Sequence, residues 1–147
     1  MTKDLGVEVV PLATMHLSMA PPVRLDNTPS GTRIVVEFIE ARWSGERITA
    51  RSVGRTHGDW LTVGPEGTGS LDFRMLLETD DGAIVYVYGL GRNDADHFFD
   101  GAPNYFTMSF ETGHEDYAWL NRIQAVAKGR LDAAHPGEIR FEVYELR

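Results

Sequence analysis

The chain has 147 residues, 42% hydrophobic and 24% charged, a composition typical of a globular protein and a length that predicts one domain over residues 1–147. Its formal net charge is −8 and no run of lysine or arginine interrupts that balance, which argues against nucleic acid and anionic membrane surfaces as partners. The chain contains no cysteine, which excludes disulfides, thiolate zinc sites and cysteine nucleophiles.

The N-terminal stretch MTKDLGVEVV lacks the long apolar core and the cleavage site of a signal peptide. Farther along the chain, no apolar run reaches the roughly 18 residues that a membrane helix needs. Both observations predict a soluble, cytoplasmic protein.

Alternation of apolar and polar residues, the pattern of a half-buried strand, recurs along most of the chain. The first alternating segment runs into APPVRLDNTPSG (20–31), a proline-rich connection that cannot form a central strand. SG at 44–45 suits a hairpin, and DDG at 80–82 is a strong turn signal. RNDADHFFDGAPN (92–104) is irregular, with room for one helical turn. The predicted strands cover residues 12–19, 32–43, 46–54, 59–63, 70–79, 83–91, 105–112, 121–131 and 138–146.

Nine short strands joined mostly by hairpin-like turns predict an all-β protein, either a sandwich or a barrel. A barrel of about eight strands can enclose room for one small ligand. One phase of several strands carries polar as well as aromatic side chains, which a dry sandwich core would not tolerate. We therefore expect a single antiparallel up-and-down β-barrel of the calycin or lipocalin type, with an internal cavity.

Three stretches together resemble a known family of small bacterial and fungal proteins, the domain of unknown function 3237. They are the segment from GDWLTV to YGLG (58–91), FETGHEDYAWLNR (110–122) and FEVYEL (141–146). The resemblance covers roughly residues 12 to 146, and ETG followed by YAWLN is its most specific part. It implies a single-domain antiparallel β-barrel and no agreed activity.

The strand SLDFRMLLE (70–78) presents four apolar side chains on one face and Asp72 and Arg74 on the other. The polar face is either a solvated surface or part of the barrel interior. Inside, the two charges would have to pair, because an unpaired buried charge is costly. We expect the inward placement, since the family resemblance includes both residues. Asp72 would then take a proton from a ligand while Arg74 or Tyr86 stabilises the oxygen left behind.

Other side chains would complete such a pocket. Tyr86 and Tyr88 share a strand face and are either packing groups or hydrogen-bond donors to a carbonyl oxygen. The stretch HEDYAWLNRIQAVAKG (114–129) is either a packed corner or a pocket rim. We expect Trp60, Tyr86 and Trp119 to line one common cavity. The predicted ligand-binding residues are Glu37, Asp59, Trp60, Tyr88, Tyr105, Trp119 and Asn121.

The five histidines are scattered, and no two have the spacing of a strong metal site. NDADH (93–97) lacks the glycine and the distal glutamate of a calcium loop. His57 is either a solvated loop residue or an acid or base. No nucleophile elbow, phosphate loop or dinucleotide fingerprint occurs, so we predict neither a metal nor a cofactor.

Two functions fit this pattern. The first is a cofactor-independent acid/base enzyme of the isomerase, cyclase or hydro-lyase type, acting on an apolar oxygenated metabolite. The alternative is a non-catalytic, lipocalin-like carrier in which the same residues only orient a small-molecule ligand. If Asp72 and Arg74 face inward, the apolar face of their strand must pack against something outside the barrel, which would suit a homo-oligomer.

Overall fold

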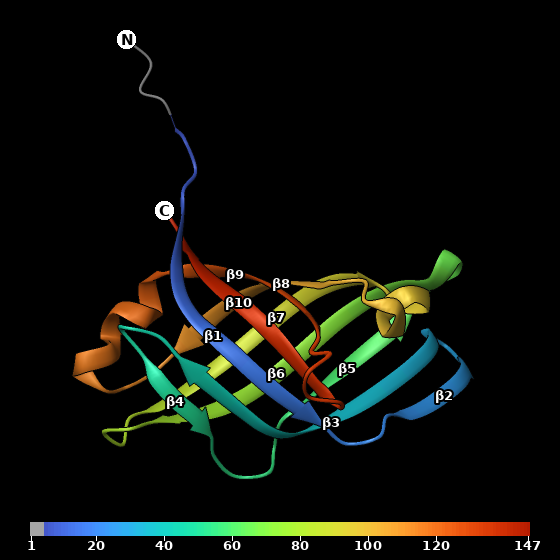
Figure 1. Ribbon diagram of the computed structural model, residues 1–147, viewed down its shortest axis with the longest axis horizontal. Helices are drawn as coiled ribbons and strands as arrows, with labels where there is room; N and C mark the ends of the chain where they lie inside the picture. The colour runs from blue at the N-terminus through green and yellow to red at the C-terminus, as the bar shows by residue number, and fades with distance from the viewer. Residues whose placement is uncertain (1–4) are drawn as a thin grey trace.

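The computed structural model describes residues 5–147, and these residues form ten β-strands and three short 3-10 helices (Figure 1). The first four residues, part of the stretch in which no signal peptide is predicted, lie outside the described residues. Among the described residues, no helix has the length and hydropathy needed to cross a bilayer. The strands are β1 (Val9–Met19), β2 (Val23–Thr28), β3 (Gly31–Ser44), β4 (Thr49–Ser52), β5 (Gly58–Val63), β6 (Thr68–Thr79), β7 (Ile84–Asp94), β8 (Asn104–Glu111), β9 (Gln124–Leu131) and β10 (Glu138–Leu146), and the helices are η1 (Pro65–Gly67), η2 (Ala95–Asp100) and η3 (Glu115–Arg122).

The strands close into an eight-stranded antiparallel barrel, which confirms the predicted fold class. The order runs β1, β10, β9, β8, β7 and β6. β6 then pairs with both β5 and β4, which lie end to end along β3, and β3 returns to β1. Because β4 and β5 share one position, the closed ring has eight positions.

The proline-rich segment 20–31 contains a strand that the sequence pattern does not predict. β2 pairs with the first half of β3, from Val23 opposite Val35 to Leu25 opposite Arg33. It has no other strand partner among the described residues, so it lies at an edge of the sheet (Figure 1). Because β2 is an edge strand, the two prolines immediately before it interrupt no hydrogen-bond ladder of a central strand. The expectation that residues 20–31 form a connection without strand structure is wrong for residues 23–28.

The barrel interior is filled by the apolar phase of the strands. On β6, Leu71, Phe73, Met75 and Leu77 are all at most 2% exposed. Burying each such side chain contributes about 1.5–3 kcal/mol, whereas burying an ion pair costs desolvation energy. The barrel prediction is confirmed, but the reason given for it, a polar inward phase, is wrong.

Four phenylalanines from β3, β6, β8 and β10 form a layer across the barrel. The ring centroids of Phe73 and Phe106 are 4.8 Å apart, those of Phe106 and Phe141 are 5.7 Å apart, and those of Phe38 and Phe73 are 6.1 Å apart. Glycines make room for two of these rings. A Cβ at Gly89 would overlap the ring of Phe73, and one on Gly129 of β9 would overlap the ring of Phe141.

The helix η3 covers the end of the barrel opposite η2, as the orange and yellow coils in Figure 1 show. Leu120 is fully buried there, and Tyr117 and Trp119 pack against the core. The Tyr117 hydroxyl donates to Asp81 Oδ1 at 2.8 Å, and Asn121 forms two backbone hydrogen bonds with Thr112. The stretch 114–129 therefore begins with a packed corner around Leu120, while Asn121 lines a pocket that Tyr86 also lines.

Candidate ligand-binding cavity

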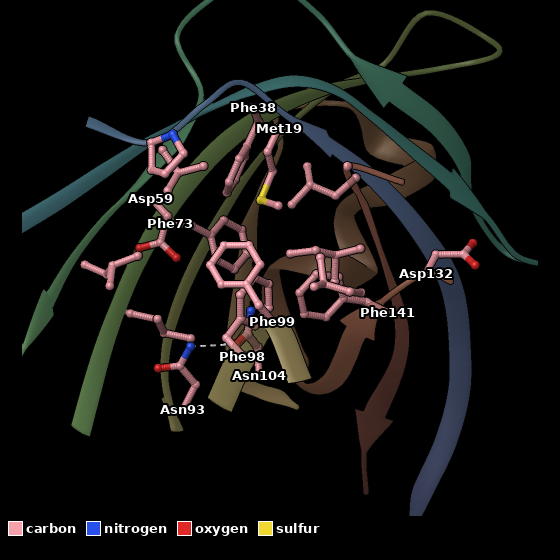
Figure 2. Close-up of a pocket in the computed structure, with 18 of the residues that line it drawn as sticks. Met19, Phe38, Asp59, Phe73, Asn93, Phe98, Phe99, Asn104, Asp132 and Phe141 are labelled. Atoms are coloured by element: carbon pink, nitrogen blue, oxygen red, sulfur yellow. Dashed lines mark hydrogen bonds between the residues drawn. The ribbon is translucent and has the colours of Figure 1, made fainter. Parts of the chain in front are cut away.

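A cavity of about 820 Å³ occupies the barrel on one side of the phenylalanine layer (Figure 2). This volume is in the range of sites for small organic molecules. The cavity reaches the surface between the β1–β2 connection, η2 and the β9–β10 turn, where Pro22, Phe99 and Pro136 line it and are exposed. The opposite end is filled by buried side chains such as Trp43, whose indole meets the ring of Phe110 edge-on.

Asp59 is the buried carboxyl group in the cavity wall. Alternation along β5 turns Asp59 inward and its neighbour Trp60 outward, and Asp59 is only 6% exposed. Its Oδ1 accepts a hydrogen bond from the backbone N–H of Asp72 at 2.9 Å. Burial raises the pKa of Asp59 to about 7, the Asp72 N–H opposes that rise, and the negative charge of Asp72 adds to it. Near neutral pH this carboxyl group therefore exists in both protonation states.

Two asparagines, the half-buried Asn93 and the buried Asn104, provide uncharged polar groups in the lining. Asn93 and Asn104 are opposite each other at the ends of β7 and β8, and Asn93 Nδ2 donates to Asn104 Oδ1 at 2.8 Å (dashed line in Figure 2). This bond leaves the side-chain amide of Asn104, which is 7% exposed, free to donate to a ligand oxygen. Neither asparagine is among the residues predicted from the sequence to form the site. Alternation along β7 could have predicted the inward position of Asn93, because Asn93 lies on the same strand face as the buried Val85 and Val87.

The lining carries negative but no positive charge. Asp100 and Asp132 line the mouth, Asp59 lies deeper, and no lysine, arginine or histidine occurs in the described lining. A carboxylate or phosphate ligand would therefore lose its hydration without gaining a counter-ion. The cavity suits a neutral, largely apolar molecule that has a hydrogen-bonding group for Asp59 or Asn104.

The three predicted catalytic residues lie outside the cavity. Asp72 and Arg74 are on the outer face of β6, with side chains 36% and 52% exposed and 3.9 Å between Asp72 Oδ1 and Arg74 Nη2. Tyr86 is on the outer face of β7, opposite Leu76. The predicted inward placement is wrong, because the apolar side chains of β6 fill the interior and alternation then forces Asp72 and Arg74 outward.

Of the seven predicted ligand-binding residues, Asp59 lines the cavity and the other six do not. Trp60 and Tyr105 are 37% and 51% exposed on outer strand faces. Trp119 lies at the closed end, with the Arg47 guanidinium 4.7 Å from its ring centroid. The prediction that Trp60, Tyr86 and Trp119 line one cavity is therefore wrong. The remaining residues outside the lining are Glu37 and Asn121, which are exposed, and Tyr88, whose ring lies 5.3 Å from the Arg74 guanidinium.

His57 is neither a solvated loop residue nor a cavity residue. It is 4% exposed, and its Nε2 lies 3.0 Å from the backbone oxygen of Gly54. The ring thus holds the loop that leads into β5, just before Asp59.

The outward position of Asp72 leads to a first prediction. Asp72→Asn should change the free energy of unfolding by no more than about 1 kcal/mol, because a partly exposed ion pair with 3.9 Å between its charged atoms contributes little. It should also lower the pKa of Asp59, since the negative charge of Asp72 is one cause of its rise. Urea unfolding and NMR titration of the Asp59 carboxyl would measure both effects. A much larger loss of stability would contradict the outward, partly exposed placement of Asp72.

The chain is similar to proteins of one family and one fold. The family model described as Protein of unknown function (DUF3237) matches residues 7–146. A UPF0311 protein of Bradyrhizobium diazoefficiens is 28% identical over 148 aligned positions, with 90% of this chain and 92% of that protein covered. A β-barrel-like protein from Acinetobacter baumannii AYE has a TM-score of 0.85 and 26% identity, with 100% of both chains covered. An enzyme from Penicillium herquei has a TM-score of 0.73 and 19% identity, with 100% of this chain and 99% of that chain covered.

Proposed function

This chain belongs to the DUF3237 family, and from that premise we propose that it is a cofactor-independent acid/base enzyme whose barrel cavity binds a neutral, apolar, oxygenated metabolite. The observation that carries the proposal is the buried Asp59 carboxyl in an otherwise mostly apolar cavity, with its pKa raised to about 7. A catalytic acid or base works best when its pKa lies near the operating pH. The enzyme from Penicillium herquei, which has the same fold, is consistent with a barrel of this kind as a site of catalysis.

Asp59 would move a proton within the bound molecule. The backbone N–H of Asp72 holds Oδ1, which leaves Oδ2 as the atom that exchanges a proton with the ligand. In its ionised form Asp59 removes a proton from an O–H or an activated C–H group, and in its neutral form it returns a proton at another atom. The amide of Asn104 would stabilise the negative charge that forms on the ligand oxygen.

Isomerisation, ring closure by addition of a hydroxyl group, and addition or elimination of water all fit this group set. Each needs proton relocation and no oxidant or reductant. The absence of a positive charge in the described lining supports a neutral substrate, because binding an anion beside Asp59 would be repulsive. A phenol, enol or ketone on an apolar ring system has the required groups.

Hydrogen exchange tests the proposal without knowledge of the product. Neutral cyclic ketones and phenols would be screened by NMR in D₂O for protein-dependent incorporation of deuterium at carbon. Asp59→Asn should slow this exchange by about 100-fold or more, the usual contribution of a positioned acid or base. Asp26→Asn is the matched control and should retain activity, since it removes an exposed carboxylate that pairs with Arg24 outside the cavity.

A binding assay distinguishes the carrier alternative. 2-Naphthol should bind the cavity, and 2-naphthoate, which carries a carboxylate in place of the hydroxyl group on the same ring system, should bind far more weakly at neutral pH, as measured by calorimetry. Binding of neutral ligands with no proton exchange for any of them would contradict the enzyme and favour the carrier. Preferential binding of 2-naphthoate would contradict the proposed substrate class itself.

A further inference from the structure

We propose that His16, Asp132 and Glu138 form a second site, on the outer surface beside the cavity mouth, that binds one divalent transition-metal ion such as Zn²⁺. The ligand atoms of these three side chains all lie within 4.8 Å of one another. Imidazole and carboxylate ligands in this combination suit zinc and similar first-row metals. The site is separate from the Asp59 chemistry and does not depend on it.

Two neighbouring strands and the start of the β9–β10 turn bring these side chains together: His16 is on β1, Glu138 begins β10, and Asp132 follows the end of β9. The register of β1 with β10 places Ser18 opposite Glu138 and His16 opposite Arg140. The backbone N–H of Asp132 donates to the carbonyl oxygen of Glu138 at 2.9 Å, which extends the β9–β10 ladder by one pair. Backbone hydrogen bonds therefore fix the backbone at all three positions before any ion binds, so binding has to order side-chain rotamers only.

The charges of the cluster favour a cation. The side chains of Asp132 and Glu138 are only 17% and 22% exposed, and their negative charges repel each other at this distance. Glu138 Oε2 is buried and has no hydrogen-bond partner within the described part of the chain. The Arg42 guanidinium approaches the other oxygen of Glu138 at 3.7 Å but is half exposed, so it compensates this carboxylate only partly. A divalent ion would satisfy the unpaired oxygen and remove the repulsion.

His135 gives the cluster additional support. Its Nδ1 lies 2.9 Å from Asp132 Oδ2, an arrangement that orients the carboxylate as outer-shell groups do around metal sites. Figure 2 shows Asp132 with its carboxylate turned away from the phenylalanine rings of the cavity. The turn that starts at Asp132 also contributes Ala133, Pro136 and Gly137 to the cavity mouth. A bound ion would therefore link the β9–β10 turn, which lines the cavity mouth, to β1 through His16.

The test is a zinc titration of tag-free protein, followed by calorimetry and by thermal unfolding. We expect one Zn²⁺ per chain and a higher melting temperature in the presence of zinc. His16→Ala and Glu138→Gln should each weaken binding by about tenfold or more, as loss of metal-supporting side chains does. Circular dichroism of the zinc-free variants checks that each keeps the barrel.

His97→Ala is the matched control. His97 has a carboxylate partner, with its Nδ1 2.9 Å from Asp94 Oδ2, but it does not belong to the three-residue cluster. This variant should bind zinc as the native chain does. The proposal is overturned if zinc does not bind saturably, if folded His16→Ala and Glu138→Gln bind it unchanged, or if His97→Ala weakens binding as much as they do.

Discussion

Replacing Asp59 with asparagine is expected to remove a pH dependence of roughly 4 kcal/mol from the free energy of unfolding. The pKa of Asp59 is about 7 in the folded chain, against a reference value of 3.8. Between these values the folded chain binds more protons than the unfolded chain, so the free energy of unfolding falls as pH rises. The contribution of neutral Asp59 to stability is complete below about pH 4 and is lost as pH rises through about 7. A difference of about three pH units at about 1.4 kcal/mol each leads to that magnitude.

Urea unfolding from pH 4 to pH 8 would measure this difference. The native chain should lose stability over that interval relative to Asp59→Asn, and the variant should be the more stable protein at pH 8. The asparagine oxygen can still accept the hydrogen bond from the Asp72 N–H, so the substitution changes the charge and little else. Asp26→Asn, at an exposed ion pair with Arg24, is the control and should follow the native curve. Parallel curves for the native chain and Asp59→Asn would show that Asp59 titrates normally.

A second large effect is expected where Phe73 covers Gly89. Phe73→Ala should cost about 3–5 kcal/mol, the usual range for deleting a buried phenyl ring. The Phe73 ring packs against both Phe38 and Phe106. Gly89→Ala should cost about 1–3 kcal/mol, because the added methyl group overlaps the Phe73 ring and forces it to move.

The two substitutions should not be additive. Once the ring has been removed, the methyl group at position 89 meets no phenyl ring, so the double variant should be more stable than the sum of the single effects indicates. Urea unfolding of the four proteins gives this coupling energy. Gly113→Ala is the control partner for Phe73→Ala, since a Cβ there has no neighbour within 4 Å, and that pair should be additive. Additivity of Phe73→Ala and Gly89→Ala would mean that the ring does not cover the glycine.

The strands and the fold class could be predicted from local pattern. Alternation identified nine of the ten strands, and DDG at 80–82 marked the β6–β7 turn. The strand that was missed, β2, follows two prolines and, within residues 5–147, forms hydrogen bonds with β3 alone, so its pattern is weak. The family resemblance, which rests on motifs such as YAWLN, is confirmed by the match over residues 7–146.

Local alternation shows which residues share a strand face: Asp72 lies with Arg74, Phe73 lies with Met75, and Asp59 is opposite in phase to Trp60. Alternation does not show which of those faces points inward, because it has two equivalent phases. Barrel closure selects the phase that buries more apolar surface. Closure also brought His16 to Asp132 and Glu138, from near opposite ends of the chain, through the register of β1 with β10. The spacing of residues along the sequence cannot predict this contact, because the contact depends on how β1 and β10 pair when the barrel closes.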